Sequence, residues 1–198
     1  MSHAGLQTTV GPRGRVVLLV GVLLGSVAGC ATTAGPPAPA VNPVAISQLP
    51  GGTLILPGQG VGPIRFGESI DDTVRLLGPG EVVTWNTNPG YHNNHFYKGR
   101  SWGQYGLAAY YNPADAYGRV EFVEISAAAW HTPNGLYFGM PFNEALRLIN
   151  PQYPPQCSDQ SGVGHYCLAL DASGIVIQSQ SRTGPLQFLR ITAPGVSL

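Results

Sequence analysis

The chain has 198 residues, of which ten are basic and ten acidic, and its length allows one domain or two small ones. Charged residues are few (10%), whereas glycine, proline and aromatic residues are abundant, a composition that favours a β-rich globular body over a disordered chain. Without a leader that carries Arg13 and Arg15, eight basic residues face ten acidic ones. This net charge near −2 excludes the basic surface typical of nucleic-acid-binding proteins.

Residues 1–29 have the pattern of a secretory signal peptide. Two arginines precede the uncharged, apolar segment 16–27, which is too short for a comfortable transmembrane span. The segment ends in Val-Ala-Gly-Cys at residues 27–30, which resembles the lipobox of bacterial lipoproteins. The resemblance implies cleavage before Cys30, a diacylglycerol on its thiol and a fatty acid such as palmitate on the new amino terminus. An ordinary signal peptide with a chance cysteine is the alternative.

Residues 30–52 are rich in proline and alanine and show no apolar periodicity. Such a composition is typical of a partly extended, semi-rigid tether. Each buried acyl methylene adds about 0.8 kcal/mol of membrane affinity, so that two or more chains at Cys30 anchor stably. We therefore expect a lipid-anchored protein on the extracytoplasmic face of the cell membrane.

A short amphipathic helix is expected after Ser69. Asp72, three residues on, completes a capping-box-like start, and the glycines and proline at 78–80 end the helix. The residues that recur at helical spacing, and would pack one apolar stripe on a sheet, are Ile70, Val74 and Leu77.

The stretch 136–151 matches the stretch 64–79 without a gap. Phe66 corresponds to Phe138, and Pro141 suits the first turn of a second helix. A match of this kind predicts an internal repeat, in which each copy is one supersecondary unit.

Strands are expected after each helix, where short apolar runs alternate with turn residues. In the first half they span 81–86, 95–98, 106–112 and 119–126, and in the second half 156–158, 165–171, 174–180 and 186–192. The expected fold is α+β. It has two tandem repeats, over residues 53–134 and 135–198, each a short helix followed by three to four antiparallel strands. The strands form one continuous or side-by-side sheet with the helices on one face.

Two cysteines remain once Cys30 is assigned to lipidation. Cys157 and Cys167 are an even pair in a chain expected to be exported, and they flank a polar, glycine-containing loop. Only His165 lies near them, whereas a structural zinc site requires four ligands. The pair therefore predicts a disulfide.

Candidate catalytic and metal-binding residues are few. His92 and His95 form a His-x-x-His pair in a polar loop, and the local sequence offers no further ligands. Glu121 and Glu124 lie three apart on an expected strand, which places them on opposite faces. We expect no catalytic residue, cofactor or metal. The alternative is an envelope hydrolase or metal-dependent enzyme with a site in the Tyr91–Tyr111 region.

Aromatic residues crowd into residues 85–111. A sheet face rich in Tyr and Trp with few charges is typical of interaction surfaces, and we expect such a face to bind a protein partner. Aromatic residues that fill a small core are the alternative. The candidate residues of the binding face are Tyr97, Trp102, Tyr105 and Tyr110.

The two Phe-Gly helical openings, at residues 66–67 and 138–139, resemble those of the β-lactamase inhibitor protein family and the related BamE-like envelope lipoproteins. The resemblance implies two helix-plus-four-strand units that form one concave sheet with an aromatic binding face. The loop between the two cysteines is similar to the short disulfide loops of that family. A shared fold does not carry a shared target, so β-lactamase inhibition is not implied. We expect a lipid-anchored, non-enzymatic binding protein of the bacterial cell envelope.

Overall fold

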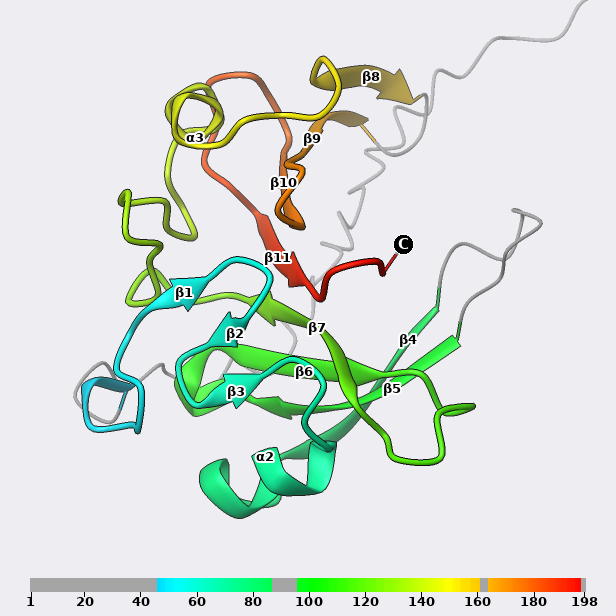
Figure 1. Cartoon of the computed structure of the whole chain (residues 1–198). Helices are drawn as coiled ribbons and strands as arrows, with labels where there is room; N and C mark the ends of the chain where they lie inside the picture. The colour runs from blue at the N-terminus through cyan, green and yellow to red at the C-terminus, as the bar shows by residue number, and fades with distance from the viewer. Residues whose placement is uncertain (1–45, 87–95, 161–163, 197–198) are drawn as a thin grey trace, which may run out of the picture. The chain divides into compact units, whose positions relative to one another are not determined.

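The computed structural model describes residues 46–86, 96–160 and 164–196, and these form a mostly β body (Figure 1). The signal peptide, Cys30, most of the tether, His92 and His95 lie outside the described residues. Within the described part of the chain, no helix is long and apolar enough to cross a membrane.

The strands form two antiparallel sheets. The small sheet contains β1 (Ile55–Leu56), β2 (Gly60–Val61) and β3 (Ile64–Arg65) in that order. The large sheet contains β4 (Glu81–Asn86), β5 (Phe96–Trp102), β6 (Leu107–Tyr111), β7 (Val120–Ile125), β8 (Gln156–Gln160), β9 (Gly164–Leu170), β10 (Ile175–Ser179) and β11 (Phe188–Thr192). Its order is β4-β5-β6-β7-β11-β10-β9-β8, so that β11 joins the two groups of four strands.

Helices are a minor part of the described chain. The α-helices are α2 (Ile70–Leu77) and α3 (Phe142–Leu148), and a 3-10 turn, η1 (Gly103–Tyr105), joins β5 to β6. The predicted capping box is confirmed in α2: Ser69 Oγ accepts from the amide of Asp72 at 3.2 Å, and the amide of Ser69 donates to Asp72 Oδ2 at 3.3 Å. Gly78 ends this helix at a φ of 87°, which a side chain would strain. No side chain caps α3, which begins after Pro141.

The expected fold class, α+β with two tandem repeats of a helix and strands, is wrong. The described residues are mostly β, in sheets of three and eight strands, and the two α-helices have only eight and seven residues. The two stretches that match in sequence also differ in what their first residues pair with. Ile64 and Arg65 form β3 of the small sheet, whereas Tyr137 makes an isolated bridge with His131. Two segments can share the spacing of their apolar residues and a glycine and still pair with different strands.

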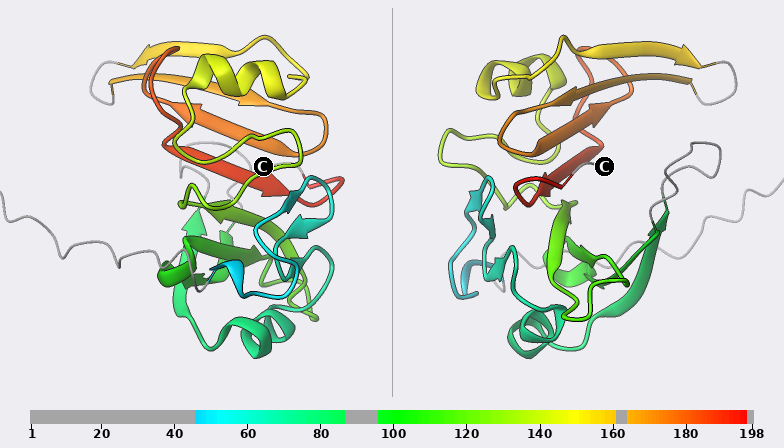
Figure 2. Two further views of the ribbon diagram at one scale, coloured as in Figure 1. Left: turned by 90° about the vertical axis from the view of Figure 1, so that its left-hand side faces the viewer. Right: turned by 45° about the vertical axis from the view of Figure 1, so that its right-hand side comes forward.

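The helices α2 and α3 and the small sheet lie on one face of the large sheet (Figure 2), and this face carries the main core. Side chains alternate along each strand, and the residues that point to this face pack against α2, α3 and the small sheet. The buried members include Ile55, Val61 and Ile64 from the small sheet, Phe142 and Ala145 from α3, and Ile70 and Leu77 from α2. Burial of this main core holds the helices and the small sheet on the same face of the large sheet.

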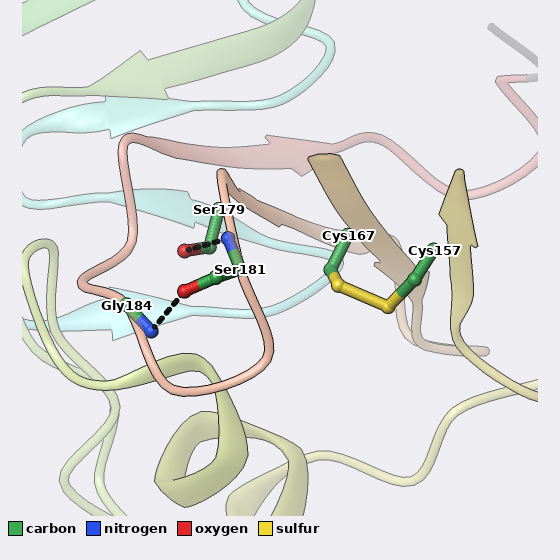
Figure 3. The surroundings of a disulfide bond; sticks show 5 residues. All are labelled: Cys157, Cys167, Ser179, Ser181 and Gly184. Atoms are coloured by element: carbon green, nitrogen blue, oxygen red, sulfur yellow. Dashed lines mark hydrogen bonds between the residues drawn. A yellow bond between two sulfur atoms is a disulfide. The ribbon is translucent and has the colours of Figure 1, made fainter. Parts of the chain in front are cut away.

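The predicted disulfide is confirmed (Figure 3). Cys157 on the edge strand β8 lies directly opposite Cys167 on β9, with their Cα atoms 4.1 Å apart. The turn that follows β10 lies nearby in the same view, where the amide of Gly184 donates to Ser181 Oγ at 2.8 Å. The bridge therefore fastens the outermost strand of the large sheet to its neighbour.

Candidate functional site: the helix-free face of the large sheet

The face of the large sheet opposite α2, α3 and the main core is called here the helix-free face. An aromatic cluster covers it over β4 to β7. Tyr97, Tyr110 and Phe122 are 3%, 6% and 0% exposed, and Trp85 and Val83 pack on them. The ring centres of Tyr110 and Phe122 are 4.6 Å apart in a stacked arrangement, and Tyr97 meets Phe122 edge-on at 4.9 Å. This half of the face is thus a second, smaller core.

Gly99 makes room for the aromatic cluster. It lies opposite Tyr110 in the β5–β6 register. A Cβ atom at this position would lie 2.8 Å from Tyr110 Cδ1 and 2.3 Å from the carbonyl oxygen of Ala109. A glycine is required here because the tyrosine ring lies flat across the neighbouring strand.

Arg190 connects the cluster to the second half of the sheet. Its Cζ atom lies 4.1 Å from the ring centre of Trp85, 4.4 Å from that of Phe122 and 4.7 Å from that of Phe188. One guanidinium nitrogen donates to Glu124 Oε1 at 2.5 Å. Burial lowers the pKa of Arg190, which is 4% exposed, while the hydrogen bond to Glu124 opposes that shift. The group therefore stays a cation, neutralised by its carboxylate partner.

Two tyrosines complete a polar network under Arg190. The Tyr110 hydroxyl donates to Glu124 Oε2 at 3.1 Å. Burial, followed by the charge of Glu124, raises the pKa of Tyr110; burial, followed by the charge of Glu121, raises the pKa of Tyr97. Both hydroxyls are therefore protonated donors at neutral pH.

A β-bulge gives Glu121 its position in this network. Tyr111 pairs with Val120 and Tyr110 pairs with Phe122, which leaves Glu121 as the extra residue of β7. The bulge interrupts the alternation of side chains, so that Glu121 and Glu124 both face the aromatic cluster. The expectation that these two glutamates lie on opposite faces is therefore wrong.

A groove of about 740 Å³ lies beside the aromatic cluster, over β9 to β11. Leu168, Leu170, Val176 and Gln178 line it from β9 and β10, where Val176 pairs with Leu170 and Gln178 with Leu168. The residues contributed by β4 and β11 are Trp85, Phe188, Arg190 and Thr192. Leu170 is 40% exposed, so the groove is open to solvent. Hence the described residues leave this apolar surface open, next to the aromatic cluster that they cover.

The four predicted binding residues do not share one surface. Tyr97 and Tyr110 belong to the aromatic cluster, but Trp102 is 0% exposed in the main core, where its Nε1 donates to the carbonyl of Gly78 at 2.9 Å. Tyr105 is half-buried against the main core. Trp102 lies five residues after Tyr97 on β5, and an odd spacing places two side chains on opposite faces of a strand.

Sequence reasoning missed the residues of the groove. The signal was present in β9 and β10, because Leu168 alternates with Ala169 and Val176 with Ile177. A strand with apolar residues on both faces indicates a second apolar surface besides the one that faces the main core. The role of Arg190 carries no such signal, because it depends on contacts with residues distant in the sequence.

Comparisons with known proteins do not identify a family. No family model matches the chain, and no curated protein matches it. A crystal structure of the uncharacterized protein yfeY from Escherichia coli is similar, with a TM-score of 0.41 and 11% identity over 68% of this chain and 97% of that chain. Among the described residues, no group of three histidine, cysteine, aspartate or glutamate side chains could hold a metal ion.

Proposed function

We propose that the chain is a lipid-anchored, non-enzymatic binding protein of the bacterial cell envelope, and that it binds a protein partner on the helix-free face of its large sheet. The observation that carries this proposal is the open groove beside the aromatic cluster. The main core lies on the opposite side of the same sheet, and over β9 to β11 the described residues leave this side open to a partner.

The composition of the groove supports a protein partner. Tryptophan is enriched among the residues that dominate binding energy, and the partly buried Trp85 stands at one wall of the groove. The guanidinium of Arg190 packs on the Trp85 ring and fixes it, so little conformational entropy is lost when a partner covers that ring. Leu170 and Val176 add aliphatic surface, and covering it with a partner removes apolar area from water, which favours binding.

The leader supports the proposed localisation at a membrane of the cell envelope. The segment 16–27 followed by Cys30 has the order of a lipoprotein signal, and acyl chains at that cysteine would hold the body close to a membrane. The proline- and alanine-rich residues 30–52 would then separate the folded body from the lipid surface. A partner that is itself in the envelope is within reach of such an anchored protein.

Site-specific photo-crosslinking in living cells of the native host tests the proposal. A photo-reactive amino acid at Val176 of the full-length chain is expected to give a defined protein adduct, because the side chain lines the groove. The matched control is the same amino acid at Leu76, which is 49% exposed on α2. Equal adducts from both positions, or none from Val176, would contradict a binding role for this face.

A further inference from the structure

We infer that the groove over β9 to β11 receives an uncharged, apolar, extended segment of the protein partner. This inference rests on the proposed function and specifies the chemistry of the partner. It follows from the charge of the groove, from its shape and from its polar groups.

The charge of the groove excludes an ionic partner. Arg190 is the one ionisable group among the described residues that line it, and Glu124 already neutralises that cation. The rings of Trp85, Phe122 and Phe188 surround the guanidinium. Among the described lining residues, an acidic segment would lose its hydration without finding a free cation, and a basic segment would find no carboxylate. An uncharged segment avoids both costs.

The openness of the groove favours a chain segment over a small molecule. Small-molecule sites bury roughly 70–90% of their ligand, whereas the apolar lining here is open to solvent and Leu170 is 40% exposed. A small ligand on this surface would remain half in water. A segment carried by a larger body would bring its own surface to cover the exposed side.

The polar groups of the groove fit a peptide backbone. Gln152 and Gln178 present neutral amides at the groove, and each amide can both donate and accept a hydrogen bond. A peptide group has the same need for one donor and one acceptor. Leu168 and Leu170 are two residues apart on β9 and point to the same face, so alternate side chains of an extended segment can meet them.

Selection from a random peptide display library on the full-length chain tests the inference. The selected peptides are expected to carry aliphatic or aromatic residues and to lack charged ones. Their affinities should change less than about twofold between about 0.05 M and about 0.5 M NaCl, since screening acts on charge–charge attraction. Leu170→Asp should weaken binding about tenfold or more, because it places a charge on the apolar lining.

The matched control is Leu76→Asp on α2, which introduces the same charge at a similarly exposed leucine and should leave affinity within about twofold of wild type. Thermal unfolding of both variants verifies that they fold. Charged consensus peptides, salt-sensitive binding, no enriched peptide, or full binding by Leu170→Asp would overturn the inference. If the Val176 crosslinks persist in any of these cases, the proposed function stands and only the chemistry of the segment is wrong.

Discussion

At the scale of single residues, Arg190 is the side chain on which the helix-free face depends. It comes from β11 and contacts Trp85 of β4, four strands away in the order of the large sheet. Such a contact requires the sheet to curve toward this face, and the guanidinium holds the curvature by stacking on rings from three strands. The groove wall is therefore part of the fold as well as of the site.

Arg190→Met is expected to lower the free energy of unfolding by about 2 to 3 kcal/mol, because it leaves Glu124 as a partly buried carboxylate without its cation. Adding Glu124→Gln should recover part of the loss, since the amide removes the unpaired charge and still accepts from Tyr110. Urea denaturation of the two variants and wild type measures both effects. An unchanged unfolding midpoint for Arg190→Met would show that the pair contributes nothing to stability.

The position of a side chain was predictable only as far as strand alternation reaches. Along β5, successive side chains point to opposite faces, so that Tyr97 and Trp102 lie on different faces of the sheet. This rule alone would have excluded Trp102 from the candidate binding residues. It fails at Glu121, where the bulge changes the face to which the side chain points. Bulges depend on pairing with a neighbouring strand, and one strand's sequence does not contain that information.

At the scale of elements, the disulfide secures a free edge of the large sheet. β8 has a single neighbour, β9, and the bridge closes the short loop between them. Cys157→Ser with Cys167→Ser is expected to lower the free energy of unfolding by about 2 kcal/mol and to leave the fold unchanged, because the unfolded chain regains the freedom of a short loop. Chemical denaturation under non-oxidising conditions measures the loss.

Wild type treated with a reductant is the control for that double variant, and its stability should fall to the same level. Native protein kept free of reductant should contain no reactive thiol at either position. Two titratable thiols in that sample would be incompatible with the bridge.

The helix α2 and most strands of the large sheet were predictable because each carries a local signal in the sequence. The strand expected at residues 81–86 is β4, and the helix expected after Ser69 is α2, since alternation and a capping box are encoded within a few residues. The small sheet was missed because its strands have two residues each, too few to show a period. The fold class failed for a different reason, since similar segments were assumed to pair alike.

At the scale of the whole molecule, the proposed lipid anchor would hold the proposed binding face near a membrane. Cys30→Ala is expected to abolish labelling by a fatty-acid probe and to leave the leader uncleaved, because the thiol is the expected acylation site. Metabolic labelling, with the mass of the mature protein, measures both results. Continued labelling of this variant would contradict the lipoprotein assignment, and Cys157→Ser, which should label normally, controls for loss of a cysteine elsewhere.

The central place of β11 in the large sheet has a consequence for biogenesis. β11 follows the other seven strands in the chain but lies between β7 and β10, and its contact between Arg190 and Glu124 spans 66 residues. Until Phe188–Thr192 is available, β7 and β10 each keep an unpaired edge. Pairing so distant in sequence forms late, and we expect a chain that lacks Phe188–Thr192 to be prone to proteolysis and aggregation. Completion of the described large sheet thus depends on β11.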